Sequence, residues 1–222
     1  MQIREKMTEV TGFFSTKFYY AFRAMFFPAT RFCKWAHITP DAVTVSSMVL
    51  GCIMGVFFAL DRLLIAIPFG LAMSFADIVD GQLAKAYGEI TPFGGILDST
   101  IDRYNEFFVF AGLGARYYFL NRPLMMGVCA LGFLGSVMIS YVKARAESDG
   151  FECKVGRLQR PERLSLIGVG VLIGGLGFDA GLDGIMLFIG GFTHVTAFYR
   201  LHHVSRQARK PGSGNRSGTS MS

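Results

Sequence analysis

Apolar residues along this chain gather in long runs that approach the roughly 20 residues a helix needs to cross a membrane. Polar or turn-forming residues separate neighbouring runs. Six runs stand out, at 41–60, 63–85, 94–118, 123–145, 161–177 and 183–203. The pattern therefore predicts an all-α integral membrane protein with six transmembrane helices.

The segment before the first run has a different character. Residues 9–36 mix Phe and Tyr with recurring Lys and Arg, a pattern typical of an amphipathic helix that lies in the membrane interface. A first spanning segment is the alternative. We expect three regions: an N-terminal interfacial helix within 1–37, a six-helix transmembrane domain over 38–205, and a disordered Gly/Ser-rich tail over 206–222.

Composition supports an embedded chain. Of the 222 residues, 51% are hydrophobic and only 17% are charged, and the mean hydropathy is +0.40. Soluble domains carry about 25% charged residues. The net charge of +6 has a ready explanation in membrane topology, and we expect no nucleic-acid partner.

Basic residues are distributed unevenly between the two sides that six spans create. They concentrate before the first span, in the 143–163 connection and after the last span, whereas the opposite loops hold only Arg62, Arg116 and Arg122. The positive-inside rule therefore predicts a multi-pass protein of the plasma (inner) membrane with both termini in the cytoplasm.

Four acidic residues stand where membrane helices normally avoid charge. Asp77 and Asp80 share a helix face with Gly81 and Ala84 near the end of the second run. After a break at 88–92, Asp98 and Asp102 follow with a spacing of four on the next helix, on one face with Gly94. Two antiparallel helices joined by this short turn bring the carboxylates together on the predicted cytoplasmic side.

Carboxylates that crowd together near a membrane repel one another unless cations compensate them. Oxygen ligands without His or Cys suit hard ions such as Mg²⁺ or Mn²⁺. Four such acids can hold two ions about 4 Å apart, an arrangement that supports displacement at phosphorus. Helix caps and salt bridges, with Lys85 and Arg103 as partners, are the structural alternative.

The complete run, Asp77-x2-Asp80-Gly81-x2-Ala84-Lys85-x8-Gly94-x3-Asp98-x3-Asp102, resembles the signature of the CDP-alcohol phosphotransferases. Every acid and glycine matches in spacing. One position departs, because the family has Arg where this chain has Lys85. Lysine keeps the charge but lacks the bidentate fork of a guanidinium.

The resemblance implies a homodimeric membrane enzyme with six spans that transfers a substituted phosphate from a CDP-alcohol to a hydroxyl and releases CMP. It implies two Mg²⁺ or Mn²⁺ ions held by the four aspartates, and Asp102 as the general base. It also implies that Asp77, Gly81, Ala84 and Lys85 line the site of the CDP-linked lipid. The ITPDAVT stretch at 38–44 resembles the family's first-span entrance and adds Thr44 to that site.

A second cluster is basic. The stretch 140–164 and the end of the sixth run supply five cations at the predicted cytoplasmic mouth, namely Lys143, Arg145, Arg160, Arg163 and Arg200. Arginine forks suit phosphate oxygens, so the cluster indicates an acceptor that itself carries phosphate. Contact with lipid headgroups combined with the positive-inside bias is the alternative.

The segment SYVKARAE, with RPERL further on and Arg200, resembles bacterial phosphatidylinositol-phosphate synthases and their archaeal relatives that act on ether lipids. This resemblance implies that the five cations hold inositol 1-phosphate and that the donor is CDP-diacylglycerol or a CDP-linked ether lipid. Glycerol 3-phosphate, which would give phosphatidylglycerol phosphate, stays an alternative acceptor. From other classes, a divalent-cation transporter predicts acids spread across the bilayer, and a non-catalytic scaffold needs no aligned acids.

Overall fold

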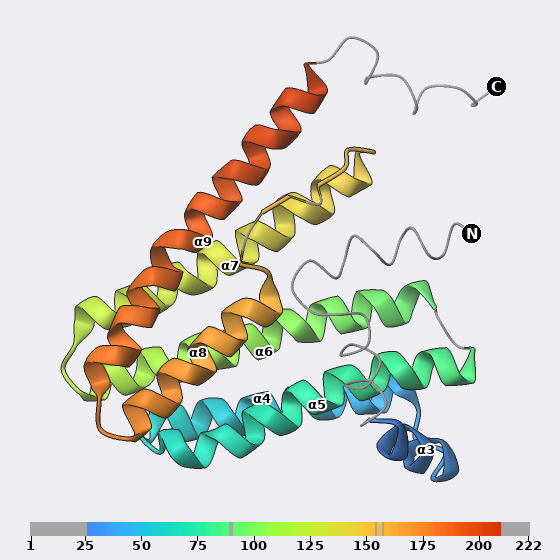
Figure 1. Ribbon diagram of the computed structural model, residues 1–222, viewed down its shortest axis with the longest axis horizontal. Coiled ribbons are helices and arrows are strands. Elements are labelled where there is room, and N and C mark those ends of the chain that lie inside the picture. The colour runs from blue at the N-terminus through green and yellow to red at the C-terminus, as the bar shows by residue number, and fades with distance from the viewer. Residues whose placement is uncertain (1–25, 89–90, 154, 157, 210–222) are drawn as a thin grey trace. The chain divides into compact units, whose positions relative to one another are not determined.

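The computed structural model describes residues 26–88, 91–153, 155–156 and 158–209, and this part of the chain consists of helices and turns without a strand (Figure 1). The helices are α3 (Phe27–Trp35), α4 (Pro40–Ala59), α5 (Leu63–Tyr87), α6 (Pro92–Phe119), α7 (Pro123–Ser148), α8 (Arg160–Gly175) and α9 (Asp179–Ala208). The all-α prediction is confirmed for these residues.

Four of these helices are long and apolar enough to cross a membrane, namely α4, α5, α7 and α9. The helix α6 has 28 residues but carries several charges, and α8 has only 16 residues. At 1.5 Å per residue, α8 is about 24 Å long, which is less than the roughly 30 Å of a hydrocarbon core. A membrane-embedded helical protein is supported, and the count of six spans stays a prediction.

The predicted end regions are described only in part. Within the expected interfacial segment the structure describes residues from 26 onwards, and α3 there exposes Phe27, Phe32 and Trp35. At the other end, α9 continues to Ala208, so the first residues of the expected tail are helical. Residues 1–25 and 210–222 lie outside the described part of the chain.

The chain divides into two compact units. The first comprises 1–48 and 72–101, and the second comprises 49–71 and 102–222. The described part of the first unit has an apolar core that joins α4 and α5, with the buried members Phe26, Val43, Ala76, Val79 and Leu83. This core fixes the face of α5 that carries Asp77 and Asp80.

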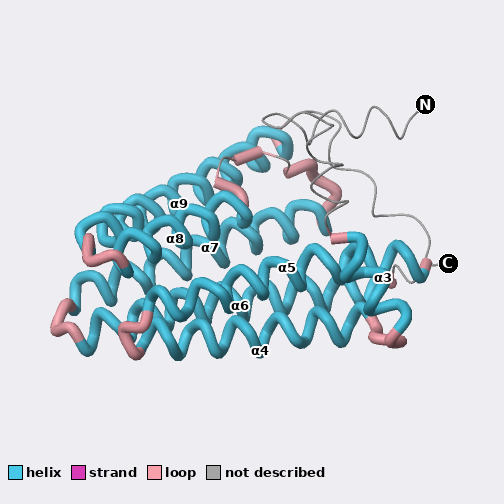
Figure 2. The backbone as a smooth tube through the Cα atoms, turned by 60° about the horizontal axis from the view of Figure 1, so that its bottom comes forward, coloured by secondary structure: helices cyan, strands magenta, loops and turns pink. Residues whose placement is uncertain are grey.

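In the second unit, α9 packs against both α7 and α8 (Figure 2). Glycines allow the closest helix contacts in this unit. A Cβ atom on Gly112 of α6 would lie 2.3 Å from the carbonyl oxygen of Gly55 in α4, so only glycine fits there. A Cβ atom on Gly135 of α7 would likewise lie 2.2 Å from the hydroxyl of Thr193 in α9. These contacts set the positions of the helices that carry the charged residues.

Candidate active site

Three of the four predicted acidic residues form one group. Carboxylate oxygens of Asp77 on α5 and Asp98 on α6 lie within 4.8 Å of each other, and Asp102, one turn further along α6, offers an oxygen within the same distance of Asp98. All three side chains are half-buried. Two oxygens that share one Mg²⁺ at about 2.1 Å each lie up to about 4.2 Å apart, so a small side-chain movement suffices to bind such an ion.

The fourth acidic residue, Asp80, is placed differently. Its carboxylate accepts a hydrogen bond of 2.6 Å from the Thr44 hydroxyl on α4, and the residue is only 6% exposed. Three residues along a helix correspond to about 300° of rotation, so Asp80 points about 60° away from Asp77 and toward α4. The predicted role of Asp80 as a metal ligand, and that of Thr44 at the CDP-lipid site, stay predictions.

Further along α5, the residues expected to line the CDP-lipid site leave open space. A Cβ atom on Gly81 would meet nothing within 4 Å, and Lys85 is exposed one turn later. Ala84 is half-buried beside it. This face of α5 is therefore accessible to a ligand that approaches the backbone closely.

Two arginines of α8 contact two acids of α6, forming two consecutive ion pairs between these helices. Arg160 Nη2 lies 2.6 Å from Asp102 Oδ1, and Arg163 Nη2 lies 2.6 Å from Glu106 Oε1. The second pair is almost fully buried, with 2% of the Arg163 side chain and 1% of the Glu106 side chain exposed. Breaking such a pair by removing one partner leaves an uncompensated buried charge.

The local sequence explains why α8 begins where these arginines are needed. Pro161 stands in the first turn, where its missing N–H removes no helical hydrogen bond. Gln159 and Glu162 form a capping box, in which the backbone N–H of Gln159 donates to Glu162 Oε2 at 2.9 Å. Arg160 and Arg163, three residues apart, stand about one turn apart on the same face of α8. Asp102 and Glu106, four residues apart, stand about one turn apart on the same face of α6, so the two pairs can meet.

The connection before α8 is held by arginines too. Arg163 donates to the carbonyl of Leu158 at 3.0 Å, and Arg200 of α9 donates to the carbonyls of Val155 and Ile139, both at 2.8 Å. Arg163 and Arg200 are buried, and their hydrogen bonds to these carbonyls hold the backbone around the site in place.

Cys153 lies buried in the same connection. Burial raises the pKa of its thiol above the ordinary value, and the nearby Arg200 guanidinium opposes that rise. The thiol is therefore a neutral packing group at this point of the fold.

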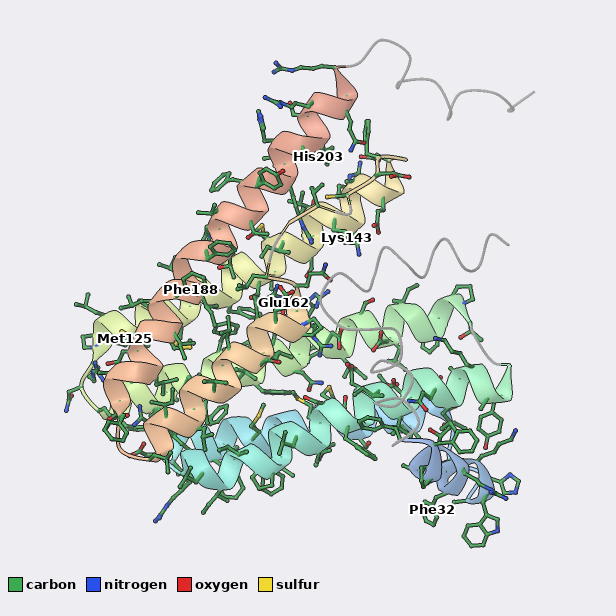
Figure 3. The ribbon with its side chains drawn as sticks, in the orientation of Figure 1. Phe32, Met125, Lys143, Glu162, Phe188 and His203 are labelled. Atoms are coloured by element: carbon green, nitrogen blue, oxygen red, sulfur yellow. The ribbon has the colours of Figure 1, made fainter. Side chains whose placement is uncertain are left out.

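The remaining two predicted cations behave differently. Lys143 and Arg145 are exposed on the last turns of α7, where Figure 3 labels Lys143. Lys143 lies 3.9 Å from Glu147, and Arg145 lies 3.3 Å from Asp149. Exposed pairs of this kind contribute little to stability. The predicted set of five cations thus divides into three arginines turned into the protein and two side chains at its surface.

Sequence reasoning overlooked Glu106. It continues the spacing of Asp98 and Asp102 on the same face of α6, so the four-residue periodicity was the available signal. The neighbouring Asn105 is buried as well. Asp102 pairs with Arg160, and Arg103 lies 3.9 Å from Glu106.

Known proteins resemble this chain over most of its length. The family model of the CDP-alcohol phosphatidyltransferases matches residues 37–196. The archaetidylinositol phosphate synthase of Methanothermobacter thermautotrophicus is 32% identical over 164 residues, 74% of this chain and 82% of that protein. The phosphatidylinositol phosphate synthase of Mycobacteroides abscessus is 35% identical over 177 residues, 76% of this chain and 78% of that protein.

Solved structures agree with these sequence relatives. The crystal structure of Mycobacterium tuberculosis phosphatidylinositol phosphate synthase with CDP-DAG bound has a TM-score of 0.79 and 27% identity, over 88% of this chain and all (100%) of that one. The same protein in complex with manganese and citrate has a TM-score of 0.77 and 29% identity, over 86% and 92% of the two chains.

The metal complex of that relative and the oxygen-only donor group described above both support a divalent ion at this site. The match to the family model covers well over half of the chain, and it includes every acid of the motif. This chain is therefore a membrane enzyme of the CDP-alcohol phosphatidyltransferase family.

Proposed function

We propose that this enzyme transfers the phosphatidyl group of CDP-diacylglycerol, or the equivalent group of a CDP-linked ether lipid, to inositol 1-phosphate and releases CMP. One observation carries the choice of acceptor. The bacterial and the archaeal relative differ in the lipid part of their names, yet both names contain inositol phosphate. The part that the two names share supports inositol phosphate as the acceptor.

In this proposal Asp77, Asp98 and Asp102 hold divalent ions, with Asp80 as the fourth ligand of a two-ion site. Bound Mg²⁺ or Mn²⁺ neutralises the pyrophosphate of the CDP-lipid and stabilises the departing CMP. The open face of α5 at Gly81, beside Ala84 and Lys85, supports a CDP site there.

Asp102 is the proposed general base. An inositol hydroxyl attacks the phosphorus on the lipid side in line with the leaving group. A new O–P bond forms, the bond from that phosphorus to the oxygen of CMP breaks, and the hydroxyl proton passes to the Asp102 carboxylate. The ion pair of Arg160 with Asp102 Oδ1 supports the orientation of this carboxylate.

Arg160 is the best-placed candidate to hold the phosphate of the acceptor. It stands beside Asp102, and 19% of its side chain is exposed, in contrast to the enclosed Arg163. Lys143 and Arg145 offer further charge at the surface. Arg163 and Arg200 contribute by ordering the connection that precedes α8.

The membrane arrangement belongs to the proposal as well. The apolar runs support six spans, and the distribution of Lys and Arg supports a cytoplasmic location of both termini and the site. The resemblance to the family supports a homodimer.

The decisive experiment measures CMP release by purified protein with CDP-diacylglycerol and Mg²⁺. Inositol 1-phosphate, free inositol and glycerol 3-phosphate are compared as acceptors. We expect turnover with inositol 1-phosphate alone. Turnover with glycerol 3-phosphate instead would retain the metal site and refute the acceptor, and equal turnover with free inositol would refute the role of the arginines in binding phosphate.

A further inference from the structure

A second charged cavity lies within the second unit, where α4 and α8 end and α5 and α9 begin. Its volume is about 440 Å³, and four charged residues line it, namely Asp61, Arg62, Arg116 and Asp179. Arg116 stands fourteen residues after Asp102 on the continuous helix α6, which corresponds to about 21 Å along the helix axis. The cavity is therefore separate from the candidate active site.

Arg116 holds the two aspartates of this cavity. Its Nε lies 2.5 Å from Asp61 Oδ1, and its Nη2 lies 2.7 Å from Asp179 Oδ1. Only 4% of the Arg116 side chain is exposed, whereas 55% of Asp61 and 47% of Asp179 are exposed. One buried guanidinium thus faces two carboxylates, and this cluster carries a net charge of about −1 that is accessible from outside.

Arg62 follows Asp61 directly and has the opposite charge. It is exposed, and no ion pair joins it to an acid within the described part of the chain. The cavity therefore presents a negative and a positive region side by side. A ligand that matches both regions carries one anionic and one cationic group a few bonds apart.

The remaining lining is apolar or small. Leu63, Leu64 and Ile65 are the first residues of α5, a helix suited to span the membrane, and Leu64 and Ile65 are 46% and 47% exposed. Glycines at the end of α8 complete the wall, namely Gly174, Gly175 and Gly177. Charged groups at the end of spanning helices, beside exposed aliphatic side chains, lie at the depth of phospholipid headgroups.

We propose that this cavity binds the headgroup of a zwitterionic phospholipid. The lipid phosphate contacts Arg62, its ammonium group lies between Asp61 and Asp179, and its acyl chains run along the exposed side chains at the start of α5. The buried Arg116 keeps the two aspartates apart and oriented. An anionic lipid fits less well, because it lacks a cation for the two carboxylates.

Native mass spectrometry of the detergent-solubilised full chain tests the proposal. Phosphatidylethanolamine and phosphatidylglycerol with identical acyl chains are titrated against the wild type, Arg62→Gln and Arg206→Gln. Arg206 is an exposed cation at the other end of α9 and serves as the matched control. We expect phosphatidylethanolamine to bind at least about fivefold more tightly than phosphatidylglycerol, and Arg62→Gln to weaken that binding about tenfold.

The control substitution is expected to change the affinity less than about twofold. Equal affinity for the two lipids, or an unchanged affinity in Arg62→Gln, overturns the proposal. Inorganic phosphate added at tenfold molar excess over the lipid separates a lipid site from a simple anion site. Retention of the lipid supports the proposal, and displacement by phosphate alone refutes it.

Discussion

Both halves of α6 form ion pairs between arginines and carboxylates, but α6 supplies the carboxylates in one half and the arginine in the other. Toward its beginning the helix supplies carboxylates, and the arginines come from α8. Toward its end the helix supplies Arg116, and the carboxylates come from the α4–α5 turn and the start of α9. The two ends also differ in whether carboxylates lie close enough together to bind a metal ion.

At the beginning of α6, Asp98 and Asp102 stand together with Glu106 on one face. Arg160 and Arg163 pair with Asp102 and Glu106. Asp98 also lies within metal-binding distance of Asp77 on α5. At the end of α6, Arg116 is saturated by two carboxylates and holds neighbouring turns together. Ion pairs alone, or an excess of acids over arginines, therefore do not mark a reaction site. The candidate site differs in that carboxylate oxygens of Asp77 and Asp98 lie within reach of one metal ion.

The largest effect is expected from Asp98→Asn. An amide keeps the shape of the side chain but loses the charge that holds a divalent ion, so CMP release should fall about 1,000-fold. Binding of Mn²⁺, followed by electron paramagnetic resonance, should weaken at least about tenfold. The control is Glu152→Gln, which neutralises an exposed carboxylate in the connection before α8. Similar losses in both variants would contradict a specific metal site.

The next effect concerns the buried pair of Glu106 and Arg163. Arg163→Ala should lower the free energy of unfolding by about 3–5 kcal/mol, because Glu106 is left as a buried charge. Replacing both residues by Met should recover part of this loss. Thermal unfolding of Arg163→Met, Glu106→Met and the double Met variant forms the double-mutant cycle.

A different result would reassign Arg163. If Arg163→Ala raises the KM for inositol 1-phosphate and leaves the stability unchanged, Arg163 contacts the acceptor as the sequence comparison predicted. If it destabilises the protein and raises the KM values for both substrates alike, its role is to position the backbone.

A smaller effect is expected from Arg160→Gln. The substitution should raise the KM for inositol 1-phosphate about tenfold and that for the CDP-lipid less than threefold, since the acceptor phosphate is the only substrate group that the guanidinium is proposed to contact. Steady-state CMP release with each substrate varied in turn measures both values. Arg206→Gln provides the matched loss of an arginine, and an equal rise for both substrates in Arg160→Gln would argue against a specific contact.

The smallest effect is expected near the far end of α6. Arg122 pairs with Asp183 at the start of α9 and is 38% exposed, so Arg122→Gln should lower the free energy of unfolding by less than about 1 kcal/mol. Thermal unfolding at low and high salt measures it. A loss as large as that of Arg163→Ala would show that ion pairs at the two ends of α6 contribute equally to stability.

The local features of this site can be predicted from the sequence, but few of the contacts between residues far apart in the chain can. Apolar runs predict the helices to within a few residues. The period of one helix places Asp98 and Asp102 on one face, and the short turn at 88–92 predicts that Asp77 on the preceding helix lies near them. The contact of Arg163 with Glu106 joins residues 57 positions apart, and no periodicity encodes such a pairing.

The same reason explains the remaining differences. Whether Asp80 turns toward a metal or toward Thr44 depends on the packing of α4 against α5. Whether the Arg145 side chain is buried in the protein or exposed at its surface depends on where α7 ends, and α7 continues to Ser148. Both are tertiary outcomes that a single sequence does not display.

The contact between Gly55 and Gly112 has a consequence for how this protein can change over time. Since even one methyl group on Gly112 would meet the carbonyl oxygen of Gly55, substitutions at that position push α4 and α6 apart. Asp102 lies ten residues earlier on the same rigid helix and would move with it. A saturation mutagenesis screen should therefore find Gly112 among the least tolerant positions, although it contacts no substrate and carries no reactive group.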